Sequence, residues 1–154
     1  MDGYKLTYNV DMVFCIDATG SMRHVLDFVK QNALNLYRDV VAEMDKKHKV
    51  IHQLRVRVIA FRDYVADGED AMLSSDFFTL PDESQMFLDC MNGIAAKGGG
   101  DIPEDGLEAL AYAIRSDWTR EGIKKRHIIV VWSDAPTHEL GHGKIAPWYP
   151  EGMA

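Results

Sequence analysis

The chain has 154 residues, a length typical of one domain, and its hydrophobic fraction (47%) and charged fraction (27%) are those of an ordinary globular protein. Its net charge of −7 repels phosphate backbones, which argues against a nucleic-acid-binding protein with a broad basic surface. No secretory leader and no apolar run long enough to cross a bilayer can be recognised, so we expect a cytoplasmic protein with no membrane partner. The two cysteines, Cys15 and Cys90, fall in apolar patterns and are predicted to be free thiols in a reducing compartment.

A buried strand is predicted over residues 10–17, because apolar residues occupy consecutive positions there, as in strands covered on both faces. Asp17 ends this strand, and two hydroxyl residues, Thr19 and Ser21, follow it at alternate positions. A helical pattern of period 3.6 then extends over residues 22–47. The two hydroxyls can therefore cap the helix or, together with the carboxylate, offer oxygen ligands to a small hard cation.

The middle of the chain alternates between strand and helix patterns. Strands are predicted over residues 53–64 and 77–80, and a helix over residues 81–94. A glycine run at 98–100 then leads to Asp101, which is predicted to cap a further helix with proline at its first position and glutamate three residues after the cap.

The last clear strand pattern covers residues 127–134 and ends in Asp134. The basic triplet at 124–126 is predicted to be the solvated start of this strand. Residues 139–154 show no periodicity, so we expect a single domain over residues 1–154, with its core at about 10–138 and an irregular tail.

Strands that alternate with helices predict an α/β fold with a mainly parallel sheet and helices on both faces. In such sheets the ligand site lies beyond the carboxyl ends of the strands. Asp17, Asp101 and Asp134 are therefore expected to gather at one edge of the sheet.

Residues 17–22 read Asp-Ala-Thr-Gly-Ser-Met, residues 98–105 read Gly-Gly-Gly-Asp-Ile-Pro-Glu-Asp, and residues 130–136 read Val-Val-Trp-Ser-Asp-Ala-Pro. In this order they resemble the three metal loops of the von Willebrand factor type A domain, which form its metal-ion-dependent adhesion site. Residues 60–64, Ala-Phe-Arg-Asp-Tyr, are similar to the second strand of that family. The resemblance covers about residues 11–138 and implies a three-layer, doubly wound, Rossmann-like fold.

The resemblance also implies the roles of individual residues. Thr19 and Ser21 correspond to direct hydroxyl ligands of a Mg²⁺ or Mn²⁺ ion, and Asp17 and Asp134 to ligands that bind directly or through water. Asp101 stands where many members have a threonine, and is expected to contact the ion through water or to alternate with its capping role. Family members usually carry at least one more strand and helix after the third loop, so the resemblance implies either that the chain is a fragment of a longer protein or that its sheet ends early. Its last strand would then lie at the sheet edge, open to a partner or to a second copy.

The function expected from these residues is binding rather than turnover. Mg²⁺ takes six oxygens in near-octahedral geometry. Two neutral hydroxyls and one or two carboxylates leave a position open, which an acidic side chain of a partner protein can fill. We therefore expect a metal-dependent protein-interaction module that is not an enzyme.

Two hydrolase alternatives stay open. His138-Glu139-Leu-Gly-His142 matches the H-E-x-x-H pattern of zinc peptidases, although Gly141 and other glycine and proline residues interrupt a helix there. A phosphatase with Asp17 as nucleophile would need a second carboxylate two residues later, where Thr19 stands.

Overall fold

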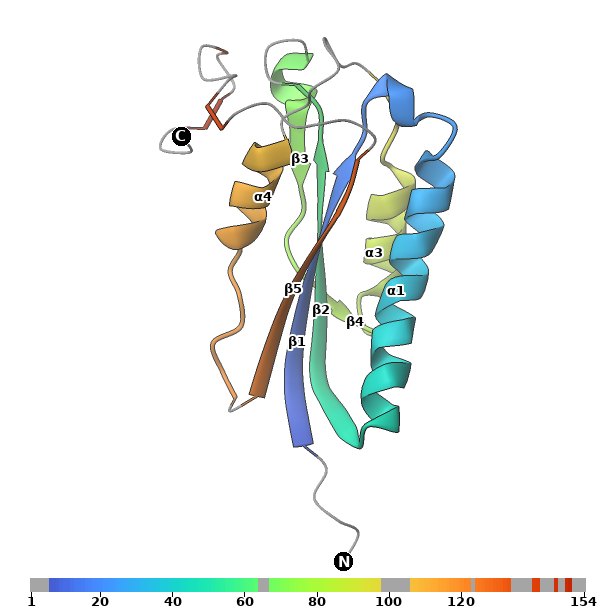
Figure 1. Cartoon of the computed structure of the whole chain (residues 1–154), viewed down its shortest axis with the longest axis vertical. Helices are drawn as coiled ribbons and strands as arrows, with labels where there is room; N and C mark the ends of the chain where they lie inside the picture. The colour runs from blue at the N-terminus through green and yellow to red at the C-terminus, as the bar shows by residue number, and fades with distance from the viewer. Residues whose placement is uncertain are drawn as a thin grey trace, which may run out of the picture.

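The computed structural model describes residues 6–63, 67–97, 106–122 and 124–133, together with residues 140, 141, 146, 149 and 150. Within these ranges the chain has an α/β fold with a mixed sheet of five strands and three α-helices (Figure 1). The predicted α/β class is confirmed. The sheet is mixed because two short strands run antiparallel to the long ones, whose pairings are parallel.

The centre of the sheet is the first strand. The strands are β1 (Leu6–Asp17), β2 (Lys49–Phe61), β3 (Met72–Ser74), β4 (Phe78–Leu80) and β5 (Lys124–Trp132). β1 lies between β2 and β5 and is parallel to both, while β3 and β4 each pair antiparallel with β2. Side chains on both faces of β1 are buried, with Phe14 and Ile16 on one face and Val13 and Cys15 on the other. The strand predicted at 10–17 is therefore confirmed, as is its coverage on both faces.

Strand ends differ from the sequence prediction where basic residues join the sheet. β2 begins at Lys49 rather than at 53, and β5 begins at Lys124 rather than at 127, so the basic triplet forms the start of the strand, with Lys124 and Arg126 exposed as predicted. Two of these basic residues contact a ring near the start of β1. The cations of Lys49 and Arg126 lie over the ring of Tyr8, at 5.4 and 4.8 Å from its centroid. Cation–π contacts of this kind add a modest attraction between the starts of neighbouring strands, while the charged groups still reach water.

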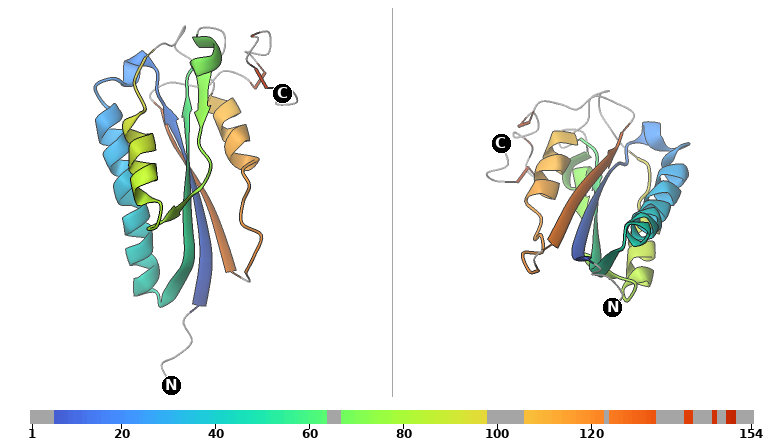
Figure 2. Two further views of the ribbon diagram at one scale, coloured as in Figure 1. Left: turned by 180° about the vertical axis from the view of Figure 1, so that it is seen from behind. Right: turned by 60° about the horizontal axis from the view of Figure 1, so that its bottom comes forward.

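Helices cover both faces of the sheet (Figure 2). They are α1 (Leu26–Lys46), α3 (Ser84–Asn92) and α4 (Gly106–Ile114). α1 and α3 pack on one face, and α4 packs on the other (Figures 1 and 2). Each helix buries a short apolar stripe, because residues three or four positions apart share one helical face.

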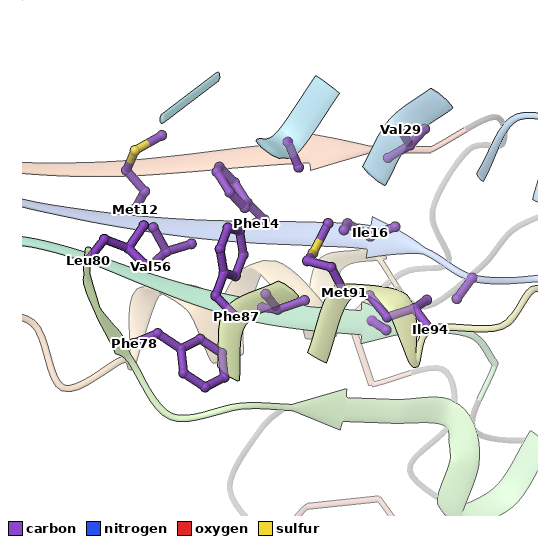
Figure 3. Packing of buried hydrophobic residues seen from close by; sticks show 14 of the residues in the cluster. Met12, Phe14, Ile16, Val29, Val56, Phe78, Leu80, Phe87, Met91 and Ile94 are labelled. Carbon is purple, nitrogen blue, oxygen red and sulfur yellow. The ribbon is translucent and has the colours of Figure 1, made fainter. Parts of the chain in front are cut away.

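The larger core lies between the sheet and the α1–α3 layer (Figure 3). Phe14 of β1 is at its centre, with ring centroids 6.3 Å from Phe87 of α3 and 5.4 Å from Trp132 of β5. The smaller core beneath α4 packs Val13 and Cys15 against alanines of that helix.

In the described part of the chain, β5 is hydrogen-bonded to β1 on one side and to no strand on the other. None of the helices in that part combines the length and the apolar character needed to span a bilayer.

Both cysteines are free thiols, as predicted, but their surroundings differ. Cys15 is fully buried in β1, and burial raises the pKa of its thiol to about 12. Cys90 is half-buried in α3, and burial also raises its pKa. Because only the thiolate reacts, we expect iodoacetamide at pH 8 to alkylate Cys90 slowly and Cys15 not at all in the native protein. Intact mass spectrometry should show at most one adduct before denaturation and two after it, and rapid double labelling of the folded protein would contradict this burial.

Candidate metal site

The turn after β1 does not cap the long helix. Residues Gly20–Met22 form a 3₁₀ turn, η1, and α1 begins only at Leu26, four residues later than predicted. Thr19 stands at the N-cap of η1 and makes no side-chain capping hydrogen bond, and the N-cap of α1 is Val25. The interpretation of the two hydroxyls as helix caps is therefore wrong.

The Thr19 hydroxyl is hydrogen-bonded to Asp17 instead of capping a helix. Thr19 Oγ1 donates to Asp17 Oδ1 at 2.6 Å, and the Thr19 backbone N–H donates to the same oxygen at 3.0 Å. An aspartate that accepts from the backbone two residues later forms a tight local turn. This turn fixes the direction in which the chain leaves β1.

The two hydroxyl oxygens lie side by side. Thr19 Oγ1 and Ser21 Oγ are 3.2 Å apart and hydrogen-bonded, and because Thr19 Oγ1 donates to Asp17, Ser21 Oγ is the donor to Thr19. Two oxygens that bind one Mg²⁺ at neighbouring octahedral positions are about 2.8–3.0 Å apart, given metal–oxygen distances of about 2.0–2.1 Å. The hydrogen-bonded pair lies within a few tenths of an ångström of the spacing of two adjacent ligands of a small divalent cation.

Asp17 connects the ends of two parallel strands. Its side chain is fully buried, and its second oxygen, Oδ2, accepts a hydrogen bond from Ser133 Oγ at 2.8 Å. Ser133 directly follows β5, so the carboxyl ends of β1 and β5 meet at this carboxylate. Ser133 lies within the third motif but is not among the site residues predicted from the sequence. The available signal was the hydroxyl residue immediately before Asp134, at the end of an apolar strand.

Two predicted site residues, Asp101 and Asp134, lie outside the described residues. Their described neighbours do approach the first turn. Lys97, a few residues before Asp101, donates its backbone N–H to Ala18 O at 3.0 Å, and Ser133, next to Asp134, holds Asp17. The structure thus brings together Asp17, Thr19 and Ser21, and adds Ser133.

The donor set of the described site is one carboxylate with hydroxyls. Among the residues that the structure describes, no group of three or more His, Cys, Asp or Glu side chains is arranged to hold a metal ion. A hard cation such as Mg²⁺ or Mn²⁺ accepts hydroxyl and water oxygens as well as carboxylates, so this oxygen set suits it better than a metal that prefers nitrogen or sulfur ligands.

The peptidase-like motif is described only at its centre. His138, Glu139 and His142 lie outside the described residues. Leu140 and Gly141 form a turn, with φ of 92° at Gly141, and Gly141 N donates to Glu108 Oε2 at 3.0 Å. A zinc-peptidase helix would need helical backbone at these two positions.

Comparison with known proteins gives distant similarity over most of the chain. No model of a known protein family matches it. It is 28% identical, over 136 residues, to an ariadne-like RING finger protein of Acanthamoeba polyphaga mimivirus, covering 88% of this chain and 12% of that protein. It is 24% identical, over 143 residues, to the alpha-protein kinase vwkA of Dictyostelium discoideum, covering 93% of this chain and 21% of the kinase. The chain thus spans only a small part of either relative.

Proposed function

We propose that this chain is a divalent-metal-dependent protein-interaction module of the von Willebrand factor type A kind, with a three-layer, doubly wound fold. The observation that carries the proposal is the 3.2 Å spacing of the Thr19 and Ser21 hydroxyl oxygens beside the buried Asp17 carboxylate. Thr19 and Ser21 would hold the ion directly, Asp17 and Asp134 would hold it directly or through water, and Asp101 would contact it through water or alternate with its capping role. The ion would be Mg²⁺ or Mn²⁺, and the free thiols suit a cytoplasmic protein.

The hydrogen bonds of Asp17 support binding rather than catalysis. Both of its oxygens accept hydrogen bonds, from Thr19 and from Ser133, and the side chain is buried. A phosphatase nucleophile needs a carboxylate oxygen that can reach a substrate. Asp17 is instead placed to orient the hydroxyl of Thr19, which leaves a lone pair of that hydroxyl for a cation.

The bound ion would supply a positive centre with an open coordination position. Neutral hydroxyl ligands leave much of its charge uncompensated, so an anionic ligand is favoured at that position. An aspartate or glutamate of a partner protein has the required chemistry, and the partner would then depend on the metal for binding.

Removing one hydroxyl should weaken metal binding without unfolding the chain. We expect Ser21→Ala to raise the Kd for Mg²⁺ by about tenfold or more, because one of two adjacent oxygen ligands is lost. The measurement is a Mg²⁺ titration followed by backbone amide chemical shifts. Ser84→Ala is the matched control, because the Ser84 hydroxyl only donates to Pro81 O on the surface. Equal affinities of wild type, Ser21→Ala and Ser84→Ala would contradict the proposed ligand.

Acetate, a small carboxylate, tests whether the bound ion offers an open coordination position. Acetate, titrated into the Mg²⁺-saturated protein, should shift amide signals of residues 18–22, and it should cause no such shift without Mg²⁺. Shifts that are the same with and without the metal would show that the ion does not present a coordination position to an acid.

A further inference from the structure

A buried arginine stands directly after β2, beside the candidate site. Arg62 is only 1% exposed and is among the largest fully buried side chains of the described residues. Its Nε donates to Ala18 O at 2.9 Å and to Lys97 O at 3.1 Å, and its Nη2 donates to Ala95 O at 2.5 Å. One guanidinium therefore holds three backbone carbonyls from two segments that are far apart in the sequence.

Both segments belong to the proposed metal site. Ala18 lies between Asp17 and Thr19, within the first metal loop. Ala95 and Lys97 follow α3 and lead into residues 98–105, which carry Asp101. The Lys97 backbone N–H also donates to Ala18 O at 3.0 Å, so the contact between the two segments is made both by the backbone and by the arginine.

Because the Arg62 side chain is charged, burying it only to fill space would destabilise the fold. Removing a cation from water costs several kcal/mol unless its donors are satisfied. An apolar residue could fill the same volume, but it could not bind three carbonyls at once. The planar guanidinium fork has five donors in fixed directions, so it sets the relative position of the groups it binds.

We infer that Arg62 is a positioning residue of the proposed metal site, which fixes the loop carrying Asp17 and Thr19 against the segment that leads to Asp101. The inference rests on the proposed function. Groups that orient metal ligands from behind typically change metal affinity by 10–100-fold when they are replaced.

The test compares two arginines of the same region of the chain. Arg62→Lys keeps the positive charge but cannot bind three carbonyls, and we expect its Kd for Mg²⁺ to rise 10–100-fold. Arg57→Lys is the matched control. Arg57 lies in β2 and also donates to backbone carbonyls, Ser75 O at 2.8 Å and Tyr112 O at 3.3 Å, but neither belongs to the site. Arg57→Lys should bind Mg²⁺ as the wild type does, whatever stability it loses in urea unfolding.

A second measurement uses the wild-type protein and does not depend on the folding of a variant. During a Mg²⁺ titration the Nε–H signal of Arg62 should shift along the same binding curve as the amides of residues 18–22. The Nε–H signal of Arg57 should stay in place. If Arg62→Lys does not fold, this measurement on the wild type tests the role of Arg62 instead.

The outcomes separate the two claims. A wild-type chain that binds no Mg²⁺ overturns the proposed function and this inference with it. A wild-type chain that binds Mg²⁺, with a folded Arg62→Lys variant of equal affinity, overturns only the role of Arg62. If the variant does not fold, an Arg62 Nε–H signal that does not shift during the Mg²⁺ titration of the wild type also overturns the role of Arg62.

Discussion

Replacing Asp11 with asparagine is expected to destabilise the fold by about 3–5 kcal/mol, because it removes one partner of a buried ion pair. Asp11 is fully buried in β1 and accepts hydrogen bonds from Arg55 Nε at 2.9 Å, Arg55 Nη2 at 2.8 Å and Thr119 N at 2.7 Å. The carboxylate thus joins β1, β2 and the segment that precedes β5. The Arg55 side chain is 18% exposed, so water can stabilise its guanidinium when the carboxylate partner is lost. The expected loss of unfolding free energy therefore lies toward the lower end of the range of about 3–5 kcal/mol.

Urea unfolding followed by circular dichroism measures this cost. Glu43→Gln is the matched control, because the Glu43–Lys47 pair is 3.7 Å apart and about 60% exposed on both sides, and its loss should cost less than about 0.5 kcal/mol. A double variant, Asp11→Leu with Arg55→Met, should be more stable than the sum of the single effects predicts. If Asp11→Asn is no more destabilising than Glu43→Gln, the ion pair does not hold these elements together.

Replacing Phe14 with alanine is expected to cost about 3–5 kcal/mol of unfolding free energy, because it empties the centre of the larger core. The Phe14 ring is fully buried and contacts rings from two other elements, Trp132 of β5 and Phe87 of α3, the latter visible in Figure 3. The loss combines the transfer energy of the ring with the cavity left by packed neighbours that relax only partly.

Phe28→Ala is the matched control for the core replacement. Phe28 lies on α1 but is 69% exposed, so its replacement should change the unfolding free energy by less than about 0.5 kcal/mol. Both variants remove the same side chain, which is buried in β1 at Phe14 and exposed on α1 at Phe28. Similar midpoints in urea for both would mean that Phe14 is not packed as described.

The strands were the part of the fold most accessible from the sequence. β1 was found with its correct end at Asp17, because burial on both faces leaves consecutive apolar residues. Its buried Asp11 was not anticipated, because the partner Arg55 is 44 residues away and no local pattern connects them. β3 was missed because its three residues pair with β2 without a period of their own, and two of them are exposed.

In the candidate site, too, contacts between residues close in the sequence could be predicted and contacts between distant residues could not. Asp17, Thr19 and Ser21 are adjacent in the sequence, and their mutual contacts lie within a single turn. Their use could be misread as helix capping, because an N-cap and a metal loop require the same residue types. Ser133 and Arg62 reach the site through tertiary contacts, so only the folded chain reveals what they hold.

The position of β1 between two parallel partners also has a consequence for synthesis. β1 meets β2 after 43 residues, but Tyr8 pairs with Lys124, 116 residues later. At a translation rate of about 5–20 residues per second, β5 follows β1 by roughly 6–23 s. During that interval one edge of β1 has no strand beside it. The hydrogen bond from Ser133 to Asp17, also 116 residues apart, therefore forms late, so the candidate site is completed only after most of the domain has been made.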